Sequence, residues 1–502
     1  MSEIEKQVVI VGAGPAGLTA AFDLCKAGVR SIVLEKDNIV GGISRTVNYR
    51  GYHFDIGGHR FFTKVKPVHD MWVEVLQEDF LRCDRLSRIY YDKKFFYYPL
   101  KPANALKNLG LLNAFLILLS YFKAQIRPVQ PEDNLEQWVS NRFGRRLYRI
   151  FFKTYTEKVW GTPCNEISSE WSAQRIKGLS LMEAIKAALL QNPNKKGPTI
   201  KTLIDSFHYP RKGPGMMWER VARIVSENGS EIRLETETKK ILWDGERVTG
   251  IRVRRNGETE TVTGTHFITS MPLRELIRNF DPPAPEAVRK AADNLKYRDF
   301  LTVALIINKP SLFPDNWIYI HDPDVKLGRI QNFKNWSSEM VPDQSKTCLG
   351  LEYFCFEGDG LWTMPDQKLI ELGKRELELL GLARAADVED GSVVRMPKAY
   401  PVYDPTYAEA LKVVREFLAG IKNLQAVGRN GMHKYNNQDH SMLTAMLAVQ
   451  NILGHNYDLW GVNVDQEYHE QVEGEQKGID DLALVHSTQP HVPVMVPKGD
   501  RK

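Results

Sequence analysis

A short strand, a glycine-rich turn and a helix open this chain and restrict its fold more than any other feature. Residues 7–11 read as a buried strand, 18–27 have helical spacing, and 31–34 form a second apolar strand ending at Glu35. Between the first strand and the helix lies Gly-x-Gly-x-x-Gly, at Gly12, Gly14 and Gly17. These glycines permit a tight turn, close approach of backbone to a pyrophosphate, and close helix–strand packing, while the acid accepts hydrogen bonds from ribose hydroxyls. We therefore predict a βαβ unit that binds a dinucleotide at a helix N-terminus.

Further glycine turns favour FAD over NAD. Residues 40–46 and 54–59 each contain a glycine pair, which suits a long, extended cofactor. Residues 426–428 form a short strand ending in glycine, and the helix predicted at 441–453 offers a second N-terminus to the other end of a flavin. The cofactor residues expected from these patterns are Gly12, Gly14, Pro15, Ala16, Gly17, Glu35, Lys36, Gly42, Arg45, Gly57, Gly58, Gly428 and Arg429.

Eight short motifs resemble the FAD-binding superfamily of amine oxidases, protoporphyrinogen oxidases, phytoene desaturases and UDP-galactopyranose mutases. They are GGHRFF (57–62), YTEKVWG (155–161), SAQRI (172–176), NWIYI (316–320), GRIQNF (328–333), AYP (399–401), GRNGMHKY (428–435) and NNQDHS (436–441). Their order over residues 5–455 resembles the UDP-galactopyranose mutases most, particularly the longer eukaryotic kind. The resemblance implies an α/β fold, with a Rossmann-like FAD-binding domain of the GR2 type, a helical insertion and a mixed-sheet substrate domain.

The pattern of helices, strands and loops predicts how the 502 residues divide among these parts. The expected parts are a discontinuous FAD-binding domain (1–98, 199–275 and 396–460), a helical domain (99–198), a mixed-sheet substrate domain (276–395) and a polar C-terminal tail (461–502).

The resemblance also implies an activity. In the mutases a noncovalently bound, reduced FAD is the nucleophile: N5 attacks the anomeric carbon of a nucleotide-diphosphate sugar and expels the diphosphate. The flavin-bound sugar opens to an iminium, recloses through a different hydroxyl, and regains the diphosphate without net redox. The chain is then expected to be an intramolecular transferase that interconverts pyranose and furanose forms, with NAD(P)H as a candidate reductant.

Several residues match positions that this family uses. Arg175 and Arg329 match a pair that clamps the diphosphate, which suits a planar, permanently charged group that binds phosphate through two bonds. His59 lies at the turn that meets the isoalloxazine, so the residues matched to catalysis are His59, Arg175 and Arg329. The expected substrate-binding residues are Tyr155, Trp160, Arg175, Tyr319, Arg329, Tyr400 and Tyr435. The flavin positions added by the resemblance are His59, Asn437, Gln438, Asp439 and Ser441.

Two other function classes stay open. One is an oxidase or desaturase that takes hydride onto FAD from an amine or apolar substrate, and residues 209–218, YPRKGPGMMW, resemble that branch as readily. The other is a binding module without redox chemistry, as in the Rab GDP-dissociation inhibitors. The glycine turns and His59 argue against the second class. The arginine pair favours the mutase, because an uncharged hydride donor has no use for a diphosphate clamp.

Charge and cysteine content narrow the partners and the compartment. The 67 Lys+Arg and 62 Asp+Glu residues give a formal charge of +5, far from the basic stripe of a nucleic-acid binder. The five cysteines are odd in number and form no CxxC, which indicates free thiols and no metal site. The N-terminus carries charges where a signal peptide needs an apolar core. We expect a cytoplasmic protein.

One apolar run, LGLLNAFLILLSYF at residues 109–122, bears on membrane contact. It is shorter than the ~20 residues that a spanning helix needs, and Lys107 and Lys123 bracket it. A buried helix is the favoured interpretation. The alternative is a monotopic surface helix that makes peripheral membrane contact and brings the enzyme to a lipid-linked substrate.

Overall fold

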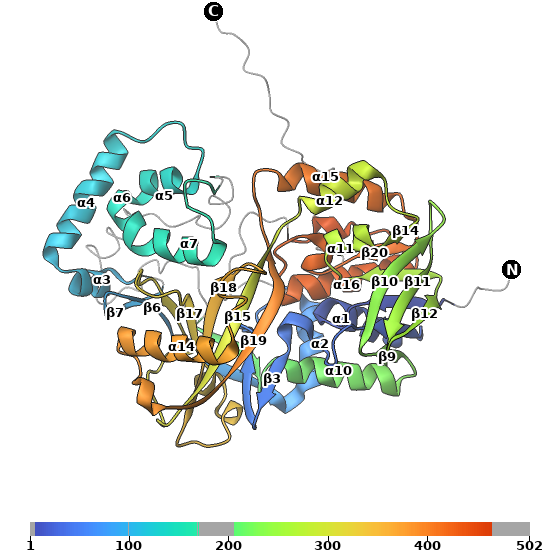
Figure 1. Cartoon of the computed structure of the whole chain (residues 1–502), viewed down its shortest axis with the longest axis horizontal. Coiled ribbons are helices and arrows are strands. Elements are labelled where there is room, and N and C mark those ends of the chain that lie inside the picture. The colour runs from blue at the N-terminus through green and yellow to red at the C-terminus, as the bar shows by residue number, and fades with distance from the viewer. Residues whose placement is uncertain (1–5, 99, 168, 170–204, 464–502) are drawn as a thin grey trace, which may run out of the picture.

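The computed structural model describes residues 6–98, 100–167, 169 and 205–463. Within these ranges a five-stranded sheet (the parallel sheet) and a seven-stranded sheet (the mixed sheet) form two halves of the molecule. A helical arm lies at the far end of the mixed sheet (Figure 1). The predicted α/β fold is confirmed.

The parallel sheet has alternating residues that pack into two different cores. Val8 and Ile10 face a layer of helices, whereas Val9 and Val11 face a second sheet with its own helices. The strands, in spatial order, are β20 (Leu424–Ala426), β13 (His266–Thr269), β1 (Val8–Val11), β2 (Ser31–Leu34) and β9 (Glu231–Arg233). The first layer consists of α1 (Pro15–Lys26), α2 (Lys66–Leu76), α10 (Gly215–Glu227) and α16 (Gln438–Ile452).

The second layer consists of a small sheet and three helices. Its strands, in spatial order, are β12 (Glu258–Thr263), β11 (Val248–Arg255), β10 (Thr236–Trp243) and β14 (Phe280–Asp281). Its helices are α11 (Leu273–Arg278), α12 (Glu286–Asp293) and α15 (Tyr407–Ala419). The antiparallel pairing of β10 and β11 confirms the hairpin that Asp244-Gly245 predicts at its turn.

The mixed sheet carries helix α14 (Asp366–Leu380) on one face. Its strands, in spatial order, are β19 (Val388–Pro401), β15 (Tyr297–Ile307), β18 (Thr347–Cys355), β17 (Arg329–Asn332), β16 (Trp317–Ile320), β6 (Ser87–Tyr91) and β7 (Lys94–Tyr97). Leu301, Val303 and Leu305 pack in the same core as residues of α14. Phe300 and Ala304, on the alternate face, pack towards β4 and the turn that follows it.

Two short ribbons and a helical turn complete these halves. The ribbons pair β3 (Thr46–Tyr49) with β4 (Tyr52–Asp55), and β5 (Phe80–Asp84) with β8 (Ser206–Pro210). Helix α13 (Phe333–Trp336) follows β17.

Domain limits differ from the sequence prediction in three places, one of which is the end of β19, whose residues 396–401 pair with β15 although we assigned them to the FAD-binding domain. Strands β6 and β7, which we assigned to the FAD-binding domain, extend the mixed sheet through the parallel pairing of β6 with β16. Conversely, residues 276–295 pack in the core of the second layer, because β14 pairs with β10. Strand partners far apart in sequence decide all three limits. Helix α16 also starts three residues earlier than predicted, where the Asn437 amide donates to His440 Nδ1 at 3.2 Å.

The helical arm follows β7. Its helices are α3 (Pro102–Leu109), α4 (Leu111–Ile126), α5 (Leu135–Phe143), α6 (Arg145–Tyr148) and α7 (Thr154–Trp160), with a π-helical turn at Arg149–Lys153 before α7. The described residues leave out 99, 168 and 170–198 of the predicted helical domain, and with them motif 172–176. They also leave out residues 464–502 of the predicted tail.

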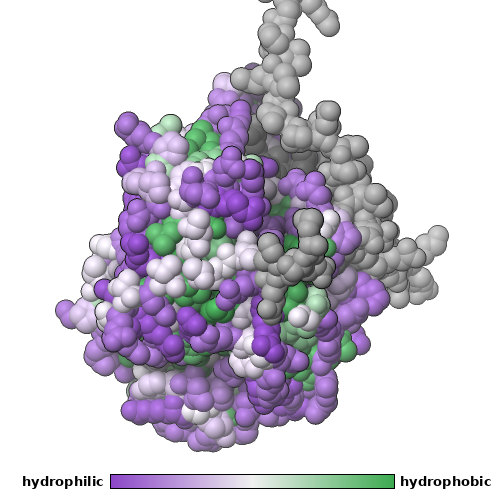
Figure 2. All heavy atoms as spheres, turned by 90° about the vertical axis from the view of Figure 1, so that its right-hand side faces the viewer, coloured by the Kyte–Doolittle hydropathy of each residue, from purple (hydrophilic) through white to green (hydrophobic). Residues whose placement is uncertain are grey.

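The favoured interpretation of 109–122 as a buried helix is wrong. Helix α4 buries Ile117 and Tyr121 but exposes Leu112, Phe115 and Phe122 on its other side. In the described ranges no single helix is long and apolar enough to cross a membrane, and α3 and α4, which together meet that criterion, bend by 113° at their junction. The end of the molecule opposite the arm is predominantly polar, with separated apolar patches (Figure 2).

Candidate active site

The first glycine turn has no room for side chains. A Cβ on Gly17 would lie 1.8 Å from the carbonyl oxygen of Gly12, so only glycine allows α1 to start this close to β1. Gly12 itself has φ +101°, and a Cβ there would lie 2.2 Å from Ser270 Oγ. A Cβ on Gly42 would lie 3.2 Å from Gly14 Cα, so the two predicted glycine turns touch backbone to backbone. The result is a bare backbone surface at the N-terminus of α1, as pyrophosphate binding needs.

Glu35 lies beside this surface at the carboxyl end of β2. Its buried carboxylate accepts hydrogen bonds from the amides of Ala13 at 2.7 Å and Asp37 at 3.0 Å. Burial raises the pKa of Glu35, and these amides partly oppose that rise. Asp37 in turn pairs with Arg45 at 2.8 Å, whereas Lys36 is exposed. The acceptor that the motif requires is therefore held in place by the chain.

A second helix N-terminus adjoins the first. A Cβ on Gly428, which has φ +82°, would lie 3.1 Å from the Cβ of Ala16 in α1. Asp439 and Ser441 are buried in the first turns of α16. The Nε2 atom of Gln438 is buried and has no hydrogen-bond partner among the described residues. A buried donor without a partner is rare in a finished structure, so this end of α16 fits a bound group that supplies an acceptor. With the glycine surface, the residues present fit a flavin dinucleotide.

The glycine pair after β4 presents His59. Gly57 has φ +94°, and a Cβ on Gly58 would lie 2.8 Å from Gln331 Nε2, so this turn packs directly on the mixed sheet. The His59 Nδ1 atom is buried, and no residue in the described ranges forms a hydrogen bond with it. Burial, reinforced by the nearby positive charges of Arg429 and Arg329, lowers the pKa of His59 to about 3. His59 is therefore neutral near pH 7.

Arg329 lies in a row of cross-strand neighbours on the same face of the mixed sheet. The register pairs Thr302 with Glu352, Glu352 with Arg329, and Arg329 with Tyr319. Arg329 Nε donates to Glu352 Oε2, and Gln331 Nε2 donates to the other carboxylate oxygen at 2.7 Å. Burial alone would lower the pKa of Arg329, but the charge of fully buried Glu352 outweighs it and holds that pKa well above its ordinary value. The row thus fixes a permanent cation at the site.

Tyrosines from three parts of the chain surround this cation. Tyr155 of α7 packs edge-on against Tyr319 at 5.5 Å between ring centroids, and Tyr400 stacks on Tyr435 at 5.6 Å. Arg329 Nη2 lies 3.4 Å from the Tyr400 hydroxyl. Six of the residues predicted for substrate or catalysis therefore gather here: His59, Tyr155, Tyr319, Arg329, Tyr400 and Tyr435.

Two further predicted residues, Trp160 and Arg429, have other roles in the described structure. Trp160 ends α7 and is half-buried. Arg429, predicted for the cofactor, donates from Nε to the Asn436 carbonyl and from Nη1 to the Ala399 carbonyl, and lies over the rings of Tyr400 and Tyr435. It therefore holds the tyrosine pair. Arg175 lies outside the described residues.

Sequence reasoning missed the residues that position the predicted ones. Lys158 donates to the carbonyls of Ile320, Asp322 and Leu327. Arg298 donates to the carbonyls of Lys158, Val159 and Phe354. These two cations fasten α7, and with it Tyr155, to the mixed sheet, and burial lowers the pKa of Lys158 to about 8.

Glu352 was also missed. One signal was available: it is the lone charge inside the apolar strand CLGLEYFC, and a buried carboxylate requires a partner.

Comparisons with known proteins agree with this architecture. The family model for "Flavin containing amine oxidoreductase" matches residues 15–428. The chain is similar to 4,4'-diapophytoene desaturase of Methylomonas sp (22% identical over 334 residues, 59% of each chain). It is also similar to phytoene desaturase of Fusarium fujikuroi (32% identical over 329 residues, 60% of this chain and 54% of the relative). L-amino-acid oxidase of Bothrops pauloensis is 26% identical over 321 residues, 61% of this chain and 60% of the relative.

Solved structures share the fold over a longer span. Reduced UDP-galactopyranose mutase superposes with a TM-score of 0.77 at 22% identity, covering 90% of this chain and 97% of the mutase. Putrescine oxidase bound to putrescine superposes with a TM-score of 0.58 at 15% identity, covering 90% and 100%.

The match to the family model is longer than the matches to individual sequences, in which the chain spans just over half the length of the curated relatives. It runs from the first turn of α1 through the whole mixed sheet to Gly428. It contains Glu35, His59 and Arg329, whereas Gly12, Gly14 and the N-terminus of α16 lie just outside it. This chain belongs to the flavin containing amine oxidoreductase family.

Proposed function

We propose that this chain is an FAD-dependent mutase that interconverts pyranose and furanose forms of a nucleotide-diphosphate sugar. The observation that carries this proposal is the arrangement of Arg329. Glu352 holds its Nε side, Nη2 lies 3.4 Å from the Tyr400 hydroxyl, and Nη1 has no hydrogen-bond partner within the described part of the chain. A guanidinium held in this way offers a free N–H edge to a phosphate.

The protonation states around Arg329 suit a diphosphate. Burial raises the pKa values of Tyr155 and Tyr400, so both hydroxyls keep their protons and can donate hydrogen bonds. His59 is neutral because burial lowers its pKa to about 3. Fixed donors and one permanent cation stabilise a leaving group that gains negative charge as it departs and must stay bound until it returns.

The chain's residues position the reactants and hold the leaving group. When bound and reduced, the flavin supplies an electron-rich nitrogen nucleophile. Gly58 packs on Gln331, and Gln331 bonds to Glu352, so the turn expected at the flavin and the Arg329 clamp share one rigid wall. We assign Arg175 to the same diphosphate as the second arginine of the clamp.

A second candidate function is net oxidoreduction, as an oxidase or desaturase. The sequence relatives, two desaturases and an L-amino-acid oxidase, favour it. The two candidates differ in redox balance. For the mutase, a priming dose of dithionite or NAD(P)H under anaerobic conditions should support many turnovers of UDP-galactopyranose, followed by NMR of the product ring form. One reductant or oxidant consumed per product would instead support the oxidoreductase.

Binding variants test the clamp without leaving a buried charge alone. Arg329→Met/Glu352→Gln removes the cation and neutralises its partner together, and it should weaken UDP binding roughly ten- to a hundredfold, as loss of a charge-assisted hydrogen bond predicts. Arg329→Lys keeps the charge but not the fork, so it should bind UDP with intermediate affinity.

The matched control is Arg88→Met/Asp315→Asn. That pair joins β6 of the same sheet to the segment just before β16, with nearly the same side-chain exposure, 19% and 0% against 21% and 0% for Arg329 and Glu352. It should leave UDP binding unchanged. Parent-like UDP affinity in Arg329→Met/Glu352→Gln, with flavin retained, would remove the basis of the mutase proposal.

A further inference from the structure

Helix α4 presents an apolar stripe that is exposed in the structure. The stripe consists of Leu112, Phe115, Leu119, Phe122 and Ile126, at alternating spacings of three and four residues, so that all five lie on one side of the helix. Leu112 is 73% exposed, Phe115 57% and Ile126 77%. The buried residues Ile117 and Tyr121 lie on the opposite side. A contiguous apolar stripe of this size marks an interaction surface.

The segment of sequence that contains the stripe carries charges of one sign. Residues 93–131 contain no Asp or Glu, although the whole chain is nearly balanced in charge. The basic residues in this stretch are Lys93, Lys94, Lys101, Lys107, Lys123 and Arg127. An apolar stripe bordered by basic residues is complementary to an anionic lipid surface, which offers acyl chains below a layer of phosphates.

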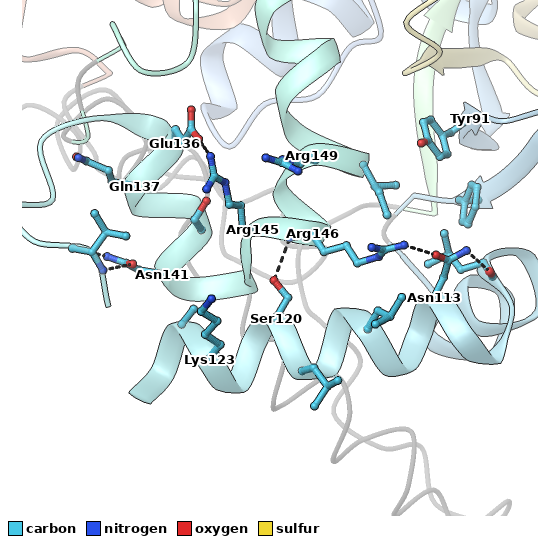
Figure 3. Close-up of a pocket in the computed structure, with 18 of the residues that line it drawn as sticks. Tyr91, Asn113, Ser120, Lys123, Glu136, Gln137, Asn141, Arg145, Arg146 and Arg149 are labelled. Carbon is cyan, nitrogen blue, oxygen red and sulfur yellow. Dashed lines mark hydrogen bonds and ion pairs between the residues drawn. The ribbon is translucent and has the colours of Figure 1, made fainter. Parts of the chain in front are cut away.

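A basic cavity of about 940 Å³ lies beside the stripe, between α4 and helices α5 and α6 (Figure 3). Lys123, Arg127, Arg145 and Arg149 line it. Its acidic lining residues are Asp92 and Glu136, and Glu136 pairs with Arg145 at 3.7 Å.

Arg146, also in the cavity wall, has a buried Nε that forms no hydrogen bond within the part of the chain that the structure describes. Its Nη2 donates to Asn113 of α4 at 2.5 Å (Figure 3). The cavity thus adds further positive charge, including a buried donor, directly beside the apolar stripe.

Length decides how the arm can meet a membrane. Helix α4 has 16 residues, about 24 Å at 1.5 Å per residue, which is less than the ~30 Å hydrocarbon core. The 113° bend between α3 and α4 prevents the two from acting as one straight span. We propose that α4 lies in the surface of an anionic membrane, with the stripe in the acyl layer and the basic residues at the lipid phosphates.

The arm also begins beside the candidate active site. Tyr98, directly after β7, packs edge-on against Tyr319 at 5.2 Å. Membrane attachment through α4 therefore brings this site towards the lipid surface. The attachment does not depend on which reaction the site performs.

Vesicle flotation of the purified full chain with its flavin tests the proposal. The parent should float with vesicles of phosphatidylcholine and phosphatidylglycerol, remain unbound with phosphatidylcholine alone, and dissociate in 1 M salt. Leu112→Gln/Phe115→Gln/Ile126→Gln should reduce partitioning roughly a hundredfold, because three large side chains no longer enter the acyl layer. Lys107→Gln/Lys123→Gln/Arg127→Gln should reduce it by at least roughly tenfold, while leaving the stripe intact.

The matched control is Val73→Gln/Leu379→Gln, two exposed apolar residues on α2 and α14. It should float like the parent. Three outcomes would overturn the proposal: no flotation of the parent, equal binding to both vesicle types, or equal binding of the parent and the stripe variant. A parent that dimerises in light scattering, does not float, and becomes monomeric with the stripe variant would assign the stripe to a second copy of the chain instead.

Discussion

The parallel sheet and the mixed sheet contribute different kinds of atoms to the same candidate site. Around the first glycine turn the binding surface is formed by backbone atoms, because a Cβ on Gly17 would lie 1.8 Å from a carbonyl oxygen. On the mixed sheet the binding surface is formed by side chains of cross-strand neighbours, among which Arg329 pairs with the fully buried Glu352. The first surface requires that no side-chain atoms be present. The second requires that the positive charge of Arg329 be balanced by a buried carboxylate. The two should therefore respond to different kinds of substitution.

A second comparison separates a binding arginine from a structural one within the mixed sheet. Arg88 donates from Nε and Nη2 to both oxygens of Asp315, at 2.8 and 2.6 Å, and so uses the whole fork on its partner. Arg329 uses only Nε on Glu352. Burial and charge are alike in the two pairs, so the unused edge is what distinguishes the candidate site.

The largest effect should come from the backbone surface. Gly17→Ala should abolish flavin binding, because its Cβ cannot coexist with the Gly12 carbonyl oxygen in this turn. The ratio of flavin absorbance to protein after purification measures this. Gly360→Ala is the control, since a Cβ at Gly360 would meet no atom within 4 Å, and it should retain full flavin content. Normal flavin content in Gly17→Ala would show that the turn tolerates side chains.

The second-largest effect should come from removing the carboxylate charge of Glu352, which balances the charge of Arg329. Glu352→Gln leaves Arg329 without its counter-charge and should lower the free energy of unfolding by about 2–3 kcal/mol, less than for a fully buried cation because Arg329 is 21% exposed. Urea denaturation measures this. Arg329→Met/Glu352→Gln should recover most of the loss. A double variant as unstable as the single would mean that packing, not charge, fixes the row.

Acid should lower the free energy of unfolding through the buried His321, which lies beside the mixed sheet. Burial lowers the pKa of His321, which stacks on Tyr155 at 4.9 Å, to about 3. Between pH 6.5 and that value the unfolded chain binds a proton that the folded chain does not, so stability falls as pH falls. From pH 6.5 to 5 this contribution is about 2 kcal/mol. His321→Gln should flatten the pH dependence of urea unfolding by that amount, whereas His455→Gln, at an exposed site, should not.

The smallest effect should come from substituting Glu35, the one side chain expected to bind FAD beside the first glycine turn. Glu35→Gln keeps the shape but replaces one acceptor oxygen with a donor. It should weaken FAD binding about tenfold, the value of one hydrogen bond, and leave the fold intact. Titration of the deflavinated chain with FAD measures this. An unchanged affinity would mean that backbone alone holds the adenosine end.

Local pattern sufficed for much of the fold. The βαβ unit and the hairpin at Asp244-Gly245 follow from short-range periodicity and turn chemistry, and the structure confirms them. Arg329 was identified through a motif. Its partner Glu352 was not, because no local pattern states which strand lies beside β17.

The glycine turns were therefore predictable from local sequence, because each glycine acts within its own few residues. The pairing of Arg329 with Glu352, the membership of β6 and β7 in the mixed sheet, and the exposure of α4 instead depend on contacts between distant parts of the chain. Cross-strand register joins residues such as Arg329 and Glu352 that are 23 positions apart. Exposure of an apolar helix depends on what packs against it, so the same run of residues that predicts a core helix can lie on the surface.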